Sequence, residues 1–202
     1  MSNGSRRIPT RRRFQPNPAV APMPTIILDR DGVINHDSDD YIKHPDEWIA
    51  IDGSLDAITR LNQAGYSVCV ATNQSGLGRG LFDLETLTMI HQKMYDGLEN
   101  LGGHIHMIAY CPHHPDAQCS CRKPSTGLLA AINQHFTLDP DTTWMVGDTA
   151  KDLECAGRMG IRAALVLTGK GKGELQKGAV SRETTPIFEN LNAFVEWLLS
   201  NR

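Results

Sequence analysis

Two aspartates, one residue apart, are the residues of this chain best suited to chemistry. Asp29 and Asp31 directly follow the apolar run 26–28, and Gly32 comes next. A run as apolar as this, bounded by Pro24 and Gly32, is typical of a buried central strand. In open α/β sheets ligands bind at the carboxyl ends of strands, so we expect both carboxylates to face a binding crevice. The two carboxylates repel each other unless a cation or a proton separates them.

The same pair has two plainer interpretations, a solvated turn and a calcium loop. A calcium loop counted from Asp29 needs a bidentate glutamate at its twelfth position, where this chain has Asp40. No helix pattern precedes Asp29 either. Short motifs of this kind also arise by chance, so the catalytic interpretation depends on further motifs downstream.

Three further polar motifs follow in order, each at the expected end of a strand or start of a helix. They are Thr72–Gly76, Arg122–Pro124 and Gly147–Asp152. Taken alone, these motifs are more simply a polar turn, a basic turn and a helix cap. Four motifs in this order at strand ends and helix starts are improbable by coincidence, so we predict that they meet in one crevice.

The residue types of these motifs suit phosphoryl transfer to a carboxylate. Asp29 is the candidate nucleophile, and Asp31 can protonate the leaving alcohol and then deprotonate the hydrolytic water. Lys123 adds a positive charge beside the transferring group, while Thr72 and nearby backbone N–H groups can bind its oxygens. We expect Mg²⁺ to be bound by the side chains of Asp29 and Asp148 and by the main-chain carbonyl of Asp31.

Alternating strand and helix patterns must position these motifs. Such alternation predicts an α/β fold with a doubly wound, mainly parallel sheet and helices on both faces. Asp152 lies one helical turn after Asp148 and is expected to brace the site or a lysine. The predicted strands are 26–28, 66–72, 105–110, 143–147 and 161–167, and the predicted helices are 54–64, 84–101, 126–136, 150–159 and 191–198.

Three details of these elements are also predicted. Ser54 and Asp83 are the expected N-caps of the first two helices. The second of these helices is expected to bury an apolar stripe that runs from Leu84 to Leu101. Residues 169–186, rich in Gly, Lys and Ser, are predicted to form a mobile surface loop.

Charge and composition limit the functional classes. Residues 1–23 contain five of the 20 basic residues and no acidic one, and we predict a disordered basic tail. The tail can instead contact nucleic acid or an anionic surface, or reflect the assigned start site. Residues 24–202, predicted to be one domain, keep 15 basic against 23 acidic residues, a formal charge of about −8 that argues against non-specific nucleic-acid binding. No apolar stretch approaches the roughly 20 residues of a membrane span, so we expect a soluble, cytoplasmic monomer.

A second cluster has the composition of a metal site. Cys111, His113, Cys119 and Cys121 supply four donors within eleven residues. Three thiolates and one imidazole suit tetrahedral Zn²⁺, and four protein ligands leave no open position, which predicts a structural ion. His114 can replace His113, and the plainer alternative is a set of free thiols with an incidental histidine. The odd total of five cysteines argues against a disulfide framework.

Taken together, the four motifs resemble the haloacid dehalogenase-like phosphatase superfamily. The matching residues are Asp29–Gly32, Thr72–Asn73, Lys123 and Gly147–Asp152, and the resemblance spans about residues 24–168. An acid two residues after the nucleophile is typical of the phosphatases in this superfamily. The resemblance implies a Rossmann-like core, here without a large cap domain, because the segments between the motifs are too short for one.

Within this superfamily, the cysteine-rich loop ending in Cys121–Pro124 is similar to a bacterial branch of zinc-containing phosphatases. That branch holds D-glycero-D-manno-heptose 1,7-bisphosphate 7-phosphatases and histidinol-phosphate phosphatases, and the segments 29–35 and 37–48 resemble the heptose enzymes most. Those enzymes remove the 7-phosphate on the route to nucleotide-activated heptose for lipopolysaccharide. The resemblance implies substrate contacts from Asp37, Ser38, Asp39, Asp40, Tyr41, Thr72, Asn73, Gln74, Ser75, Arg122 and Lys123.

Two positions bear on this resemblance, one that supports it and one that departs from it. Arg122 makes chemical sense as a clamp on a second phosphate, since guanidinium binds phosphate in a bidentate manner. Thr149, in contrast, stands where the resemblance implies a lysine directly after Asp148. Lys151 follows two residues later, and whether it reaches the same place is open.

Three rival functions stay open at this point. Histidinol-phosphate phosphatase is the nearest, because Asp37, Asp39 or Tyr41 can receive an imidazole. A nucleic-acid 3′-phosphatase is the second, using the same core and the arginine-rich tail, and the acidic body argues against it. A phospho-accepting signalling domain is the third, and Asp31 argues against it, because that residue is placed to hydrolyse an aspartyl-phosphate.

Overall fold

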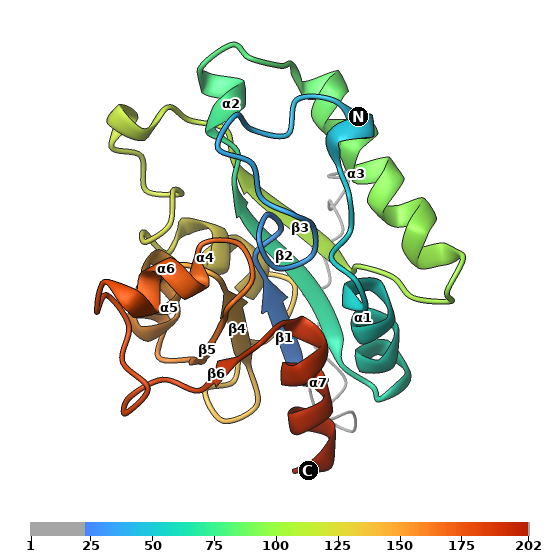
Figure 1. Cartoon of the computed structure of the whole chain (residues 1–202), viewed down its shortest axis with the longest axis vertical. Helices are drawn as coiled ribbons and strands as arrows, with labels where there is room; N and C mark the ends of the chain where they lie inside the picture. The colour runs from blue at the N-terminus through green and yellow to red at the C-terminus, as the bar shows by residue number, and fades with distance from the viewer. Residues whose placement is uncertain (1–22, 202) are drawn as a thin grey trace, which may run out of the picture.

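The computed structural model describes residues 23–201, and the predicted tail lies outside them apart from Met23 (Figure 1). Six strands form one sheet in the order β3-β2-β1-β4-β5-β6, and every neighbouring pair is parallel. This confirms the predicted doubly wound sheet. The strands are β1 (Thr25–Leu28), β2 (Ser67–Asn73), β3 (Met107–Cys111), β4 (Trp144–Gly147), β5 (Arg162–Val166) and β6 (Ile187–Phe188).

β1 occupies the centre of the sheet, as its apolar sequence predicts. It pairs with β2 on one side and β4 on the other, and all four of its residues are buried. Because the strands are parallel, their carboxyl ends lie along one edge. That edge therefore collects three of the four predicted motifs, those at the ends of β1, β2 and β4.

Helices cover both faces of the sheet (Figure 1). On one face α1 (Ser54–Gln63), α3 (Leu84–Glu99) and α7 (Leu191–Ser200) enclose the larger apolar core. On the other face α4 (Gly127–Asn133) and α5 (Ala150–Met159) enclose the smaller one. The short helices are α2 (Ser75–Gly78) and α6 (Gly171–Gln176), and single 3-10 turns are formed by Pro45–Glu47 and Pro115–Ala117.

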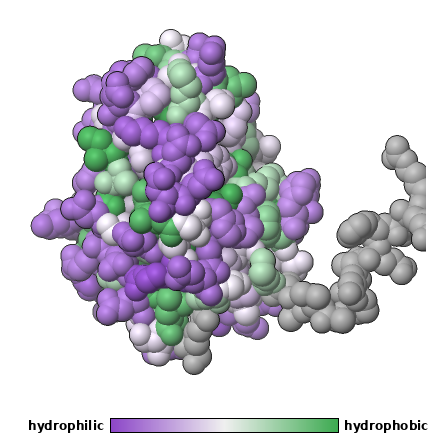
Figure 2. Space-filling view, turned by 90° about the vertical axis from the view of Figure 1, so that its right-hand side faces the viewer, coloured by the Kyte–Doolittle hydropathy of each residue, from purple (hydrophilic) through white to green (hydrophobic). Residues whose placement is uncertain are grey.

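The ends of α3 differ from the predicted apolar stripe. Asp83 does cap this helix, its carboxylate accepting from the N–H of Thr86 at 2.8 Å. The central residues of the stripe are buried, but Leu84 is 56% exposed and Leu101 is 42% exposed. Both lie beyond the part of α3 that packs on the core, so burying them is the part of the prediction that is wrong. The surface on this side of the molecule is mainly hydrophilic, with scattered hydrophobic residues (Figure 2).

The N-cap predicted for α1 is also wrong. Gly53, with φ of +77°, holds the cap position without a side-chain hydrogen bond, and Ser54 is the first helical residue. The Ser54 hydroxyl instead donates to the carbonyl of Ile34 at 2.6 Å. The serine therefore ties α1 to the loop that follows the first motif.

Residues 169–186 are not a mere surface loop, because they contain α6. Gly171 packs so tightly that a Cβ there would lie 1.8 Å from the carbonyl oxygen of Val166. Glu174 accepts from the N–H of Ala150 at 3.1 Å, which ties α6 to the start of α5. The glycines and lysines of this segment therefore encode a close turn and a charged helix. Within residues 23–201, no helix is long and apolar enough to span a bilayer.

Candidate active site

A cleft of about 240 Å³ lies at the carboxyl edge of the sheet and brings the four predicted motifs together. Asp29 and Asp31 reach it from the end of β1, Thr72 from the end of β2, and Asp148 from the end of β4. Lys123 reaches it from the loop before α4. The parallel order of the strands accounts for this convergence, as the sequence predicts.

An ion-paired chain of three residues forms the floor of the cleft. Lys123 Nζ lies 2.8 Å from Asp29 Oδ2 and 2.6 Å from Asp152 Oδ1, and the lysine side chain is 2% exposed. Burial alone lowers the pKa of Lys123, but the charges of the two carboxylates outweigh this and raise it, so the ammonium stays charged. Asp152 therefore braces the lysine, one of the two roles considered for it.

Asn73 fixes the backbone at Lys123. Its side-chain carbonyl accepts from the Lys123 N–H at 3.0 Å, and its amide group donates to the Lys123 carbonyl at 3.2 Å. One side chain thus satisfies both backbone groups of the lysine. Asn73 lines the cleft, and its side-chain contacts also fix the backbone that presents the Lys123 ammonium.

Asp29, Asp148 and Asp152 offer three carboxylate oxygens within 4.8 Å of one another. Burial raises the pKa of Asp29 to about 6, partly offset by Lys123. Burial, followed by the charge of Asp29, raises the pKa of Asp148 to about 8. The three carboxylates surround one ion-paired ammonium, that of Lys123, and a divalent cation would favour their charged forms. The donor set fits Mg²⁺, which prefers oxygen ligands.

The side chain of Asp31 lies apart from this carboxylate group. Arg30, itself 1% exposed, holds it through Nη2 at 2.8 Å, and Asn35 and Gln74 donate to it at 2.8 and 2.9 Å. Burial raises the pKa of Asp31, but Arg30 and these donors outweigh that and lower it. The predicted magnesium ligand at this position is the main-chain carbonyl, and the predicted role of the carboxylate is proton transfer.

Gln74 links this carboxylate to the second motif. Its amide nitrogen donates to Asp31 Oδ2 and to the hydroxyl of Thr72, both at 2.9 Å. The two residues predicted to handle a proton and a phosphate oxygen are therefore held by one amide. Ser75, buried at the start of α2, lines the same side of the cleft.

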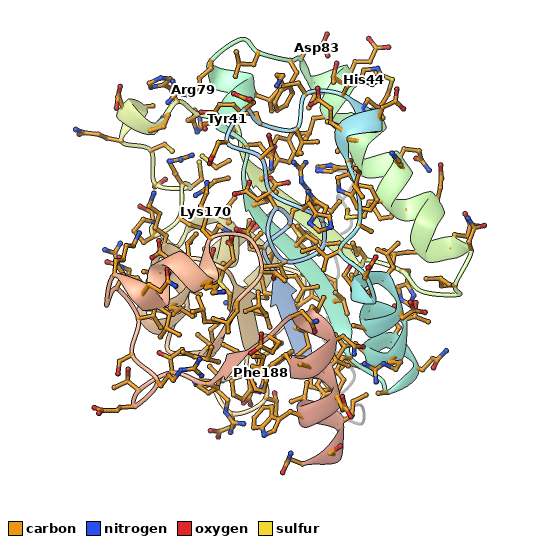
Figure 3. All side chains as sticks on the ribbon, viewed as in Figure 1. Tyr41, His44, Arg79, Asp83, Lys170 and Phe188 are labelled. Carbon is orange, nitrogen blue, oxygen red and sulfur yellow. The ribbon has the colours of Figure 1, made fainter. Side chains whose placement is uncertain are left out.

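The predicted substrate loop lies at the rim of the cleft. Tyr41 has a φ of +66°, a left-handed conformation uncommon for such a bulky residue. The Arg79 guanidinium lies 5.9 Å from the centre of its ring in a cation–π contact, and the two residues are labelled near each other in the upper part of Figure 3. Ten of the eleven predicted substrate residues line the cleft: Asp37, Ser38, Asp39, Tyr41, Thr72, Asn73, Gln74, Ser75, Arg122 and Lys123.

Asp40 is the exception among the predicted contacts. It is exposed and does not line the cleft, while its carbonyl accepts from Lys43 Nζ and its N–H donates to the hydroxyl of Ser38. The predicted substrate contact of Asp40 is not supported by this geometry.

The cleft also contains residues that sequence reasoning missed as contacts. Lys170 lines it from the turn before α6, and Lys151 and Thr149 line it from the start of α5. A lysine between glycines after the last long strand gave no recognisable signal, because its role depends on where the turn folds back. The sequence left open how far Lys151 reaches, and in the structure it lines the cleft.

The predicted zinc ligands come together beside this cleft. Sulfur atoms of Cys111, Cys119 and Cys121 lie 3.2–3.5 Å apart, and His113 Nδ1 lies 3.2 Å from the Cys121 sulfur. Tetrahedral ligands at zinc–sulfur distances place sulfurs roughly 3.7 Å apart, so the donor set fits the metal. All five cysteines are free of disulfides. His114 instead accepts from the N–H of Asp116, so His113 is the histidine that joins the sulfurs.

Comparisons with known proteins identify relatives of this chain. A family model described as HAD-hydrolase-like matches residues 120–194. A D-glycero-beta-D-manno-heptose-1,7-bisphosphate 7-phosphatase from Pseudomonas putida is 49% identical over 88% of this chain and 100% of its own length. One from Neisseria meningitidis is 47% identical over 88% of this chain and 95% of its own. The crystal structure of D,D-heptose 1,7-bisphosphate phosphatase from B. bronchiseptica, complexed with magnesium and phosphate, is 48% identical with a TM-score of 0.85, covering 89% of this chain and 100% of that one.

Proposed function

Because the chain belongs to the haloacid dehalogenase-like phosphatases, in the branch of the heptose 1,7-bisphosphate 7-phosphatases, we propose that it hydrolyses the 7-phosphate of D-glycero-D-manno-heptose 1,7-bisphosphate. The β-anomer in the relatives' names supports the same anomer here. Membership in this family makes the chain a phosphoric monoester hydrolase. The reaction would serve nucleotide-activated heptose synthesis for the lipopolysaccharide core.

One observation carries the chemical part of this proposal. Asp29 directly follows the central strand, is ion-paired with Lys123 at 2.8 Å, and shares the cleft with Asp31. The Asp29 oxygen attacks phosphorus, the bond from phosphorus to the sugar oxygen breaks, and that oxygen takes a proton from Asp31. Water then attacks the aspartyl-phosphate, Asp31 removes its proton, and Asp29 is released together with inorganic phosphate.

Other residues assist without bonding to phosphorus. Lys123 and Thr72 are placed to stabilise the oxygens of the transferring group. Mg²⁺, held by Asp29, Asp148 and the Asp31 carbonyl, would screen the repulsion between the nucleophile and the phosphate. Arg122 supports a bisphosphate substrate, because its Nη1 is buried without a hydrogen-bond partner among residues 23–201. An incoming phosphate can supply that partner.

Steady-state phosphate release from a panel of esters with Mg²⁺ tests the substrate. The panel contains both anomers of heptose 1,7-bisphosphate, histidinol phosphate, fructose 1,6-bisphosphate and a 3′-phosphorylated oligonucleotide. We expect kcat/KM to be highest for the β-heptose ester, by about 10⁴-fold over histidinol phosphate, since a site built to hydrogen-bond substrate hydroxyls discriminates by this much against an ester that lacks them. A preference for histidinol phosphate or for the oligonucleotide contradicts the proposed substrate.

We further propose that Cys111, His113, Cys119 and Cys121 bind a structural zinc ion that shapes the loop leading into Arg122 and Lys123. Replacing Cys119 by serine should reduce bound zinc from about one per chain to well under one, and lower the melting temperature, because closed zinc sites contribute folding energy. Metal analysis of the purified protein measures this.

Cys69→Ser is the matched control for the zinc variant. Cys69 is buried in β2 away from the zinc ligands, so this change should leave the zinc content unaltered. Equal zinc in the Cys119→Ser protein and the wild type would refute the site. All five thiols are free of disulfides, which supports the proposed reducing, cytoplasmic location. The monomer stays a prediction.

A further inference from the structure

The turn between β5 and α6 carries a lysine that the mechanism above does not use. Lys170 Nζ lies 3.1 Å from Asp37 Oδ2 and 3.9 Å from Asp39 Oδ1. The main-chain N–H of the same residue donates to Asp148 Oδ2 at 2.8 Å. One residue therefore contacts the magnesium-binding group with its backbone and the predicted substrate loop with its side chain. In Figure 3, Lys170 lies beside the turn that leads into α6, on the side toward Tyr41.

The turn that presents this lysine is fixed against the first motif. The hydroxyl of Thr168 donates to the carbonyl of Gly32 at 2.6 Å. Gly169 has a φ of +56°, and a Cβ there would lie 2.2 Å from Asp148 Oδ2 and 2.6 Å from the Gly32 Cα. A side chain does not fit at this position. These contacts therefore fix the backbone of Lys170 relative to the loop that carries Asp29.

The position that the resemblance assigns to a lysine cannot supply this charge. Thr149 follows Asp148 directly, and its N–H and hydroxyl bind Asp152 Oδ2 at 3.1 and 2.7 Å as the cap of α5. Lys123 is already paired with Asp29 and Asp152. Among the lysines that line the cleft in residues 23–201, Lys170 is the one ion-paired with Asp37.

The ion pair between Lys170 and Asp37 balances charge in the cleft. Asp37, Asp39 and Asp148 place three carboxylates on one side of a cleft that must accept an anionic ester. An ammonium between them offsets their repulsion toward phosphate. The contact also orients Asp37, whose side chain is 20% exposed, so that an oxygen can accept hydrogen bonds from hydroxyl groups.

We propose that Lys170 is a positioning residue that fixes Asp37 as the acceptor for hydroxyl groups in the polyol part of a sugar phosphate. The contact thereby sets the preference for polyhydroxylated over aromatic phosphate esters. This inference rests on the proposed function as a sugar phosphatase. The residue acts on substrate binding through Asp37, and its side chain contacts neither of the proposed metal-ligand side chains, Asp29 and Asp148.

A double-mutant cycle tests this role. Lys170→Met, Asp37→Asn and the double variant are assayed with Mg²⁺ on heptose 1,7-bisphosphate and on p-nitrophenyl phosphate, whose leaving group lacks hydroxyls. Asp37→Asn should lower the ratio of the two kcat/KM values about 10- to 100-fold, mainly through KM on the sugar ester, the size expected for a charge-assisted hydrogen bond. Lys170→Met should lower it about 3- to 10-fold, because the lysine side chain is 54% exposed and its ion pair is partly screened by solvent. The double variant should lower the ratio no further than the larger single change, because both remove one contact.

Two further variants sharpen the cycle. Lys170→Arg should recover most of the ratio, because a guanidinium can also pair with Asp37. Lys172→Met is the matched control, since Lys172 lies exposed on α6 and does not line the cleft. A ratio for Lys170→Met within about twofold of the wild type, or effects that multiply in the double variant, would overturn the proposal.

The outcome of this cycle is separable from that of the proposed function. If the wild-type enzyme hydrolyses fructose 1,6-bisphosphate rather than the heptose ester, the proposed substrate is wrong. The cycle is then measured on that polyol ester. A fall in its kcat/KM relative to that of p-nitrophenyl phosphate still supports the role of Lys170. A wild-type enzyme that does not prefer the heptose ester would contradict the proposed substrate. An unchanged ratio of the two kcat/KM values in Lys170→Met would contradict the role of Lys170.

Discussion

Replacing Asp29 by asparagine should reduce kcat by about 10⁴-fold or more, because an amide oxygen cannot form the phosphoenzyme. The change is nearly isosteric and leaves Lys123 paired with Asp152, so the fold should persist. Stopped assays of phosphate release on the heptose ester measure the loss. Zinc content and the melting temperature, both close to those of the wild type, establish that the variant is folded.

Asp46→Asn is the matched control for this variant. Asp46 lies in the exposed turn before α1, and its carboxylate is 90% exposed, so the same change of charge there should leave kcat unaltered. If Asp29→Asn keeps more than about one-tenth of the wild-type kcat in a sample free of contaminating phosphatase, Asp29 is not the nucleophile.

Replacing Asp31 by asparagine should slow both half-reactions, each by the roughly 10²- to 10⁴-fold typical of a lost general acid or base. Comparing esters with different leaving groups distinguishes formation of the phosphoenzyme from its hydrolysis. p-Nitrophenolate leaves without a proton, so the first half on that ester should suffer less than hydrolysis of the phosphoenzyme. A burst of p-nitrophenol of about one equivalent per chain is therefore expected from this variant in stopped flow.

The same variant has a structural cost that the experiment must control. The buried Arg30 guanidinium pairs with the Asp31 carboxylate, and a neutral amide leaves it partly uncompensated. We expect a loss of stability of about 1–3 kcal/mol, measured by denaturant unfolding. Full activity in Asp31→Asn, or equal slowing of both esters with no burst, would remove Asp31 from the proposed role.

The elements that sequence patterns predicted well are those with a strong local cause. β1 is an uninterrupted apolar run and is buried throughout. Asp83 precedes a periodic helix and caps it. The four motifs lie at the ends of parallel strands or in the loop before α4, so the topology alone brings Asp29, Thr72 and Lys123 into one cleft.

The features that the sequence did not reveal depend on contacts between distant segments. Ser54 is a plausible cap by type, but the carbonyl of Ile34, 20 residues away, takes its hydroxyl. Lys170 belongs to a segment whose composition is typical of a loop. Its place in the cleft follows from Thr168 and Gly169 packing on Gly32, a contact over 136 residues. Local patterns contain no information on such pairings.

The central claim is that phosphorus is carried by the carboxylate of Asp29. A crystal structure of the enzyme with Mg²⁺ and beryllium fluoride, a mimic of the phosphoryl group, tests this claim most directly. We predict that the fluoride complex is bonded to a carboxylate oxygen of Asp29, within hydrogen-bonding distance of Lys123 and Thr72. A complex bonded to any other side chain in the cleft, such as Asp31 or Asp148, would contradict the account.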